Sequence, residues 1–296
     1  MSHDSRQVAL IRAMPVVFVL IWSTGFIVAR FGMPHAPPMK FLALRYMFSV
    51  VCFAAWAYFA HAALPRDRTQ YLHLAVTGIL MHAGYLGGVW AAVKMGMGAG
   101  LTALLVGLQP VLTAIWVSSR GGAVAARQWA GLALGFGGLA LVVWQKLGVG
   151  EISAANLVAA TIALFSITAG TLYQKRYLAP CDVRTASLVQ LAAAFAVTLP
   201  LALMEAEAID WHGEMIGAMA WSVLALTLGG SSLLYLLIQR GAATAVTSLL
   251  YLVPPCTAVM AAILFGEPIG VFTVAGMALT AAGVSLVVRS PPSLKA

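Results

Sequence analysis

The sequence predicts an all-α membrane protein with ten transmembrane helices, arranged as two inverted repeats of five helices each. Three observations lead to this prediction. Hydrophobic residues make up 61% of the 296 residues and charged residues 9%, whereas a soluble domain is about half apolar and about a quarter charged. Ten apolar runs of roughly membrane length follow one another along the chain. A long stretch of the first half also recurs in the second half.

The recurring stretch is 99–143, which aligns without a gap on 244–288, 145 positions later. Leucines and valines often match by chance in so apolar a chain, so the matching prolines and glycines are the evidence for the repeat. The matched pairs are Pro110 with Pro255, Gly121 with Gly266, Gly131 with Gly276, and Gly138 with Gly283. We therefore divide the chain into two homologous halves, residues 1–147 and 148–296.

The ten apolar runs are separated by prolines, glycines and charged residues. All ten should be helices, because lipid satisfies no backbone polar group and the runs are too long, and too uniformly apolar, for barrel strands. The polar segment 1–12 leads into the first run without a small-residue cleavage site, which favours a retained span over a signal peptide. The expected spans are 13–29, 41–60, 71–93, 98–118, 128–144, 155–173, 185–204, 216–238, 243–265 and 271–288.

The distribution of Lys and Arg predicts the orientation. With the N-terminus in the cytoplasm, 12 of these residues fall inside and 4 outside, as the positive-inside rule requires. The acidic loop 205–214 then falls outside. We expect an integral protein of a bacterial inner membrane with both termini in the cytoplasm.

Composition also excludes several classes of protein. The three cysteines, Cys52, Cys181 and Cys256, are odd in number and scattered, which argues against a disulfide framework or a metal site. The basic residues are dispersed between apolar runs, so membrane topology explains the high pI better than a nucleic-acid partner does. No cofactor is expected.

The odd number of spans in each half inverts the second half, which gives a pseudo-two-fold axis in the membrane plane. Two such halves can exchange conformations and expose one central site to each side in turn, so a transporter is the favoured class. A membrane enzyme and a signalling or assembly protein stay open as alternatives. No histidine box, catalytic triad or carboxylate pair supports an enzyme, because the histidines are spread over different loops and span ends: His35, His61, His73 and His212.

Several local patterns carry a family resemblance. Trp22-Ser23 lies midway along the first span, Arg45 lies early in the second, and the 100–110 stretch reads Gly-Leu-Thr-Ala-Leu-Leu and ends in Gln-Pro. Gly266-Glu267-Pro268 precedes the tenth span. The whole chain resembles the drug/metabolite transporter superfamily in its ten-helix EamA branch, and within it the YddG-type exporters of aromatic and other amino acids. The first half has no glutamate matching Glu267, which is therefore expected to cap a helix or anchor a loop.

The resemblance implies a central cavity surrounded by helices 1, 3, 4, 6, 8 and 9. Polar and aromatic residues near the middle of these spans are the candidate substrate-binding residues. For each of them, ordinary packing or a bond between helices is the alternative. Aromatic members are suited to stacking on an aromatic substrate. The candidates are Trp22, Ser23, His82, Tyr85, Gln109, Ser166, Thr168, Ser231, Ser232, Tyr235 and Tyr251.

Prolines supply candidate hinges. Pro110, Pro254 and Pro255 each remove a backbone donor and free a carbonyl four residues earlier, which kinks a helix. Two of them, Pro110 and Pro255, lie at matching positions of the two halves. Such interrupted helices point to the binding site or to the hinge of a rocking motion, and a static kink is the alternative.

The spans contain no Asp or Glu at mid-membrane, where coupled carriers commonly hold their ion. His82 is the residue at that depth able to titrate near neutral pH. We expect a facilitator or exchanger, with a proton-coupled exporter of cationic drugs as the alternative. Without a buried acid for a cation, or a basic cluster for a phosphate ester, the small-molecule substrate expected is a zwitterion, namely an amino acid. Spans 128–144 and 271–288 carry almost no polar side chains and are expected to contact lipid, to pack as a scaffold, or to form a homodimer.

Overall fold

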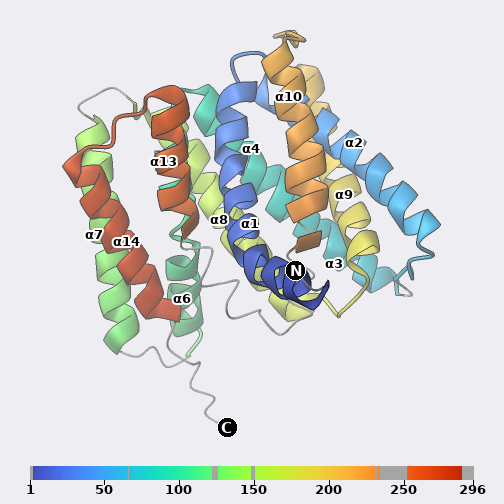
Figure 1. Cartoon of the computed structure of the whole chain (residues 1–296), viewed down its shortest axis with the longest axis horizontal. Coiled ribbons are helices and arrows are strands. Elements are labelled where there is room, and N and C mark those ends of the chain that lie inside the picture. The colour runs from blue at the N-terminus through green and yellow to red at the C-terminus, as the bar shows by residue number, and fades with distance from the viewer. Residues whose placement is uncertain are drawn as a thin grey trace.

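The computed structural model describes residues 3–65, 67–121, 126–147, 151–230, 232–233 and 252–288. These residues form helices joined by short loops, and no strand occurs among them (Figure 1). Seven helical segments are long and apolar enough to cross a membrane, and three shorter apolar helices occupy Trp129–Trp144, Val253–Phe265 and Val271–Leu286. A helix therefore stands at each of the ten expected spans. Ser231, Tyr235 and Tyr251 lie outside the described residues.

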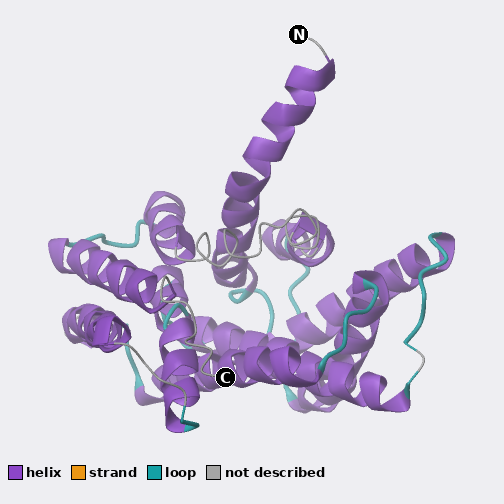
Figure 2. Cartoon of the chain, turned by 90° about the horizontal axis from the view of Figure 1, so that it is seen from below, coloured by secondary structure: helices purple, strands orange, loops and turns teal. Residues whose placement is uncertain are grey.

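The helices follow the expected order. The first half contains α1 (His3–Gly32), α2 (Pro38–Phe59), α3 (Arg68–Gly78), η1 (Ile79–Gly84), α4 (Tyr85–Lys94), α5 (Ala99–Val106), α6 (Gln109–Ser119) and α7 (Ala126–Leu147). The second half contains α8 (Ala154–Tyr177), α9 (Val183–Met204), α10 (Gly213–Trp221), η2 (Ser222–Gly230), α13 (Val253–Phe265) and α14 (Val271–Val288). Figure 2 shows that the first turns of α1 project from the other helices.

Local sequence fixes where several helices begin and end. Ser153 and Asn156 form a capping box at the start of α8, which satisfies two backbone groups that the first turn leaves open. Asp182 accepts from the backbone N–H of Arg184 at the start of α9. At the other end of α13, Gly266 takes a left-handed conformation with φ of 65°, which glycine adopts without a steric penalty.

Three expected spans are interrupted. The third and the eighth contain π-helical segments, η1 and η2, which the sequence did not predict and which often mark functional sites. The fourth breaks at Gly107 and Leu108, between α5 and α6, directly before Pro110. The missing N–H of Pro110 explains the break, and the expected kink is confirmed there. Pro254 and Pro255 occupy the first turn of α13.

The matched glycines explain how α7 and α14 pack side by side (Figure 1). A Cβ atom on Gly138 would lie 2.5 Å from the carbonyl oxygen of Gly276, and one on Gly283 would meet the carbonyl of Gly131. The glycines that repeat at 145 positions thus pair crosswise between the two helices. The sequence left lipid contact, scaffold packing and a homodimer open for these spans; the structure shows that they pack on each other, and a homodimer stays a prediction.

One end of the bundle gathers the acidic loops, and we call it the acidic end. It comprises the 33–37 connection, the 95–98 turn, the 205–212 loop with the first turn of α10, and the 266–270 loop. Hydrogen bonds join these segments to one another and to the neighbouring helices. Asp210 bonds to His35, Lys94 at the end of α4 bonds to Glu207, and Glu267 bonds to the first residue of α5.

Candidate functional site

A polar cluster lies where α2 meets η2, inside the helical bundle. Arg45 of α2 is 7% exposed, and its Nε and Nη2 atoms donate to the hydroxyl of Thr227 at 3.3 and 3.1 Å. Thr227 in turn donates to the carbonyl of Ser222, five residues earlier, at 2.8 Å. The five-residue spacing matches the wider turn of a π-helix, so η2 sets the position of the Thr227 hydroxyl that faces Arg45.

The other wall of this cluster is η1 with the start of α4. The Tyr46 hydroxyl donates to the carbonyl of His82 at 2.9 Å, and the two rings meet edge to face at 6.1 Å. The His82 side chain lies beside Gln190 of α9 and close to Arg45. Tyr85 also lies within electrostatic range of Arg45. We call Arg45, Tyr46, His82, Tyr85, Gln190 and Thr227 the Arg45 cluster.

The Arg45 cluster holds a positive charge that no negative charge balances among the described residues. Arg45 is the one charged side chain among the buried residues that the structure describes, and no ion pair involves it within those residues. A buried ion costs several kcal/mol unless an opposite charge compensates it, and a threonine hydroxyl supplies only a dipole. The planar guanidinium fork matches a carboxylate geometrically. The cluster is therefore suited to receive an anionic group.

Sequence reasoning named His82 and Tyr85 as candidates, and the structure brings both to the Arg45 cluster. It noted Arg45 as part of the family pattern but not as a candidate binding residue, and it did not name Tyr46, Gln190 or Thr227. Arg45 carried a usable signal, because an ionisable residue inside an apolar span marks a functional site by default. Its position near one end of the span obscured that signal, and the long side chain reaches along the bundle from there.

Ser23 and Trp22 of α1 lie beside the second half of the chain. Ser23 is fully buried and donates to the carbonyl of Val19 at 2.7 Å and to that of Val253 at 3.5 Å. Thr257 donates back to the carbonyl of Ser23 at 3.2 Å. These bonds join α1 to the start of α13. The Trp22 ring packs on Phe18 at 5.2 Å between centroids.

The remaining described candidates have partners within the protein. Gln109 donates to the hydroxyl of Thr171 at 2.7 Å, which links α6 to α8. Thr168 and Ser232 donate to carbonyls four residues earlier in their own helices. Ser166 lies against η1, since a Cβ atom on Gly84 would stand 2.6 Å from its hydroxyl. Ser166 therefore flanks the Arg45 cluster, whereas Gln109 belongs to a separate contact between helices.

The break of the fourth span lies against the prolines at the start of α13. A Cβ atom on Gly107 would lie 3.0 Å from Cγ of Pro254, so the glycine at the break of the fourth span permits the approach of α13. A small pocket opens beside this contact, and Leu104, Pro255 and Met277 are among its lining residues. The break that precedes Pro110 and the candidate hinges Pro254 and Pro255 therefore lie side by side.

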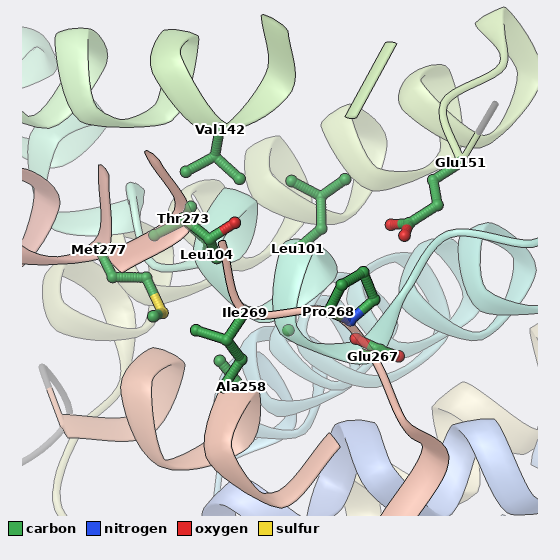
Figure 3. Close-up of a pocket in the computed structure, with 11 residues that line it drawn as sticks. Leu101, Leu104, Val142, Glu151, Ala258, Glu267, Pro268, Ile269, Thr273 and Met277 are labelled. Carbon is green, nitrogen blue, oxygen red and sulfur yellow. The ribbon is translucent and has the colours of Figure 1, made fainter. Parts of the chain in front are cut away.

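A second pocket, shown in Figure 3, lies between α5, α7, α14 and the 266–270 loop. Apolar side chains such as Leu101, Val142 and Met277 line one part of it, and the carboxylates of Glu151 and Glu267 lie at the other. Glu267 accepts from the backbone N–H of Ala99 at 3.0 Å. It thus caps α5, where a negative charge also complements the helix dipole, and this fits the capping role expected for it.

A second carboxylate performs a similar role at the acidic end. Glu205 follows α9 and accepts from the backbone N–H groups of Met39 and Lys40, at 3.0 and 2.8 Å, which are in the first turn of α2. Nearby, Lys94 pairs with Glu207 at 2.6 Å. Second-half carboxylates therefore bind first-half helices at this end.

Two of the histidines, which the sequence places in different loops, come together here. His35 lies between the carboxylates of Asp210 at 3.1 Å and Glu214 at 3.3 Å, and its ring stacks on that of His212 with centroids 4.8 Å apart. The hydrogen bond to Asp210 is the largest cause that raises the pKa of His35 above its ordinary value; desolvation opposes it, and the hydrogen bond to Glu214 adds to the rise.

The helical fold, the membrane-length spans and the repeat agree with a family comparison. The model of the EamA-like transporter family matches residues 12–144 and again residues 155–289. The chain belongs to the EamA-like transporter family. It is a membrane transporter built on the two-repeat architecture of that family.

Relatives of this EamA-like transporter align over almost the whole chain. A "Probable amino-acid metabolite efflux pump" of Salmonella typhimurium is 24% identical over 92% of this chain and 92% of its own length. An "Uncharacterized transporter" of Archaeoglobus fulgidus is 23% identical over 90% and 93%, and the "Uncharacterized inner membrane transporter YedA" of Escherichia coli K12 is 25% identical over 90% and 84%. A solved crystal structure superposes with a TM-score of 0.67 at 15% identity, covering 92% of this chain and 94% of that one, which confirms the fold.

Proposed function

We propose that this EamA-like transporter exports amino acids, including aromatic ones, by alternating access. The observation that carries the proposal is Arg45, a buried guanidinium without a carboxylate partner among the described residues. The α-carboxylate of an amino acid supplies the missing charge. The rings of Tyr46, His82 and Tyr85 beside it are suited to an aromatic side chain.

The same residue disfavours the alternative substrate. A cationic drug bound beside Arg45 would experience like-charge repulsion, which is strong where water is excluded. A zwitterion instead presents its carboxylate to the guanidinium and leaves its ammonium for carbonyls and hydroxyls. The relative described as an amino-acid metabolite efflux pump supports the same class of substrate.

The mechanism follows from the two halves and their kinks. Residues 1–147 and 148–296 act as the two moving units, and the contact between Gly107 and Pro254 lies where one unit pivots on the other. No Asp or Glu is among the buried residues that the structure describes, which favours a facilitator or exchanger over ion coupling. The positive-inside distribution places the acidic end in the periplasm and both termini in the cytoplasm.

Counterflow in proteoliposomes tests the proposal. Vesicles loaded with unlabelled amino acids, without an ion gradient, are expected to accumulate labelled Trp, Phe, Met or Thr saturably. Arg45→Gln is expected to reduce this flux about tenfold to a hundredfold, because a hydrogen bond to a charged group contributes about 1.5–3 kcal/mol and 1.4 kcal/mol is about tenfold. Arg30→Gln, at the end of α1, is the matched control and should transport normally.

The methyl ester of a transported amino acid separates the two substrate classes. If Arg45 binds the carboxylate, the ester competes poorly with the parent amino acid for the wild-type protein. Equal competition by the ester would contradict the proposal. Uptake of a cationic dye under a pH gradient, with no amino-acid counterflow, would also contradict it and would favour proton coupling through His82.

A further inference from the structure

The acidic end holds a group of metal-ligating side chains that plays no part in the proposed substrate site. His35 follows α1, and His212 and Glu214 lie at the start of α10. One ring nitrogen of each histidine and one carboxylate oxygen of Glu214 all lie within 4.8 Å of one another. His35 belongs to the first half of the chain and the other two to the second, so a ligand common to all three would join the halves.

The distances approach those of a tetrahedral metal site. Zn²⁺ binds nitrogen and oxygen ligands at about 2.0–2.2 Å, which places neighbouring ligand atoms about 3.4 Å apart. His35 Nε2 and Glu214 Oε2 are already 3.3 Å apart. His212 is exposed, so rotation about its side-chain bonds is open to bring its nitrogen closer.

The surroundings of His35 supply an independent second feature. Its other ring nitrogen, Nδ1, lies 3.1 Å from Asp210 Oδ2, and the backbone N–H of Asp210 donates to the carbonyl of His35 at 2.8 Å. A metal-bound histidine almost always donates its second N–H to a carboxylate or a carbonyl, which fixes the tautomer and the ring orientation. Here Nδ1 has that partner and Nε2 faces the next ligand.

We propose that His35, His212 and Glu214 bind a divalent transition-metal ion such as Zn²⁺, with Asp210 as the positioning residue for His35. The two imidazoles select a transition metal over Mg²⁺ or Ca²⁺, which prefer oxygen ligands. A bound ion holds the 33–37 connection against the start of α10. We call this ion-mediated contact the clamp. On the alternating access proposed above, the clamp keeps the acidic end closed and inhibits transport.

Metal binding is tested first, because it does not depend on the substrate. The full-length protein, purified and stripped of metal, is titrated with Zn²⁺ against a chromogenic chelator of known affinity. One ion per chain is expected, with a loss of affinity of at least tenfold in His35→Ala, in His212→Ala and in Glu214→Gln. Asp210→Asn is expected to weaken binding about tenfold to a hundredfold through the orientation of His35. Mg²⁺ and Ca²⁺ should not compete.

His61→Asn is the matched control. His61 is an exposed histidine after α2 with a φ of +47°, a conformation that asparagine tolerates, and it lies outside the cluster. Its removal should leave zinc binding unchanged, and each metal-free variant should still unfold cooperatively in detergent, which shows that it is folded. Absence of zinc binding to the wild type at micromolar concentration, or equal binding by His35→Ala, overturns the metal site.

The clamp has its own readout. External Zn²⁺ should inhibit counterflow by the wild type and by His61→Asn, a chelator should reverse this, and His35→Ala should resist it. Zinc that binds without inhibiting would confirm the site and overturn the clamp. If no amino acid is transported at all, the proposed function fails while the zinc titration still decides the metal site.

Discussion

Arg45 illustrates the free-energy cost of burying one charged side chain inside a helical bundle. Its guanidinium is buried against a threonine hydroxyl, and each such burial costs several kcal/mol unless an anion compensates it. An arginine that served stability alone would be better replaced by an apolar residue of similar volume. The residue is therefore best explained by a ligand that brings the opposite charge.

Asp182 illustrates a residue whose charge acts outside the spans. It caps α9 and pairs with Arg184 at 2.6 Å. The hydrogen bond from Arg184 lowers the pKa of Asp182 below the ordinary carboxyl value of 3.8, against a smaller opposing contribution from desolvation. Because the folded pKa is depressed, the pair stabilises the protein fully above about pH 4, and this contribution is lost as the pH falls through the folded pKa.

Asp182→Asn is expected to test this contribution, since asparagine caps a helix about as well as aspartate but carries no charge. The variant should melt at a slightly lower temperature than the wild type at pH 7, and the difference should vanish in strongly acidic buffer. Melting followed by tryptophan fluorescence in detergent measures both. A difference that grows on acidification would contradict the assignment.

At the scale of the element, α7 and α14 depend on glycine. Their apolar composition left lipid contact, packing and a homodimer open. The crosswise contacts of Gly131 with Gly283 and of Gly138 with Gly276 explain why both halves carry glycine at these positions. Close approach of two helix backbones in lipid maximises van der Waals contact, which drives association there in place of the hydrophobic effect.

Two glycine-to-alanine variants make this testable. Gly276→Ala places a methyl group against Val142 and 2.6 Å from the carbonyl oxygen of Gly138, so we expect overpacking of about 1–3 kcal/mol and a lower melting temperature in detergent. Gly137→Ala is the control, because a Cβ atom there meets nothing within 4 Å and alanine favours a helix by about 0.5–1 kcal/mol. A more stable Gly276→Ala would contradict the close contact.

The interrupted spans show the limit of element-level prediction. Pro110 predicts the break between α5 and α6, because every proline in a sequence marks a residue without a backbone N–H. No residue of this kind predicts η1 (Ile79–Gly84) or η2 (Ser222–Gly230), because both segments are as apolar as the helices around them. A π-helical turn depends on how neighbouring helices fit, and both of these turns face the Arg45 cluster.

At the scale of the whole molecule, second-half side chains bind first-half helices at the acidic end. Glu205 accepts from the first turn of α2, and Glu267 from the first turn of α5. Both carboxylates place negative charge at a helix N-terminus, where the dipole favours it. Opening this end requires these bonds to break, so they contribute to the free energy that separates the closed and open states.

Glu205→Ala should therefore loosen the acidic end. The backbone N–H groups of Met39 and Lys40 lose their acceptor, and we expect their hydrogen exchange in lipid nanodiscs to accelerate about tenfold or more, since a bond to a charged group contributes about 1.5–3 kcal/mol. Glu151→Ala, which removes a carboxylate from the segment before α8, is the control and should leave exchange in this turn unchanged. Equal exchange in the wild type and Glu205→Ala would show that the cap does not hold the end closed.

The membrane class, the ten spans, the repeat and the kink at Pro110 could be predicted from the amino-acid sequence, because they depend on composition, periodicity and backbone chemistry that each segment carries alone. The sequence also named His82 and Tyr85, which the structure brings close to Arg45. That Thr227 and Gln190 join them around Arg45, and that His35 and His212 meet at the acidic end, became visible in the folded chain. Those residues come from different helices or loops, and their distances are set by helix packing, which no single segment of the sequence encodes.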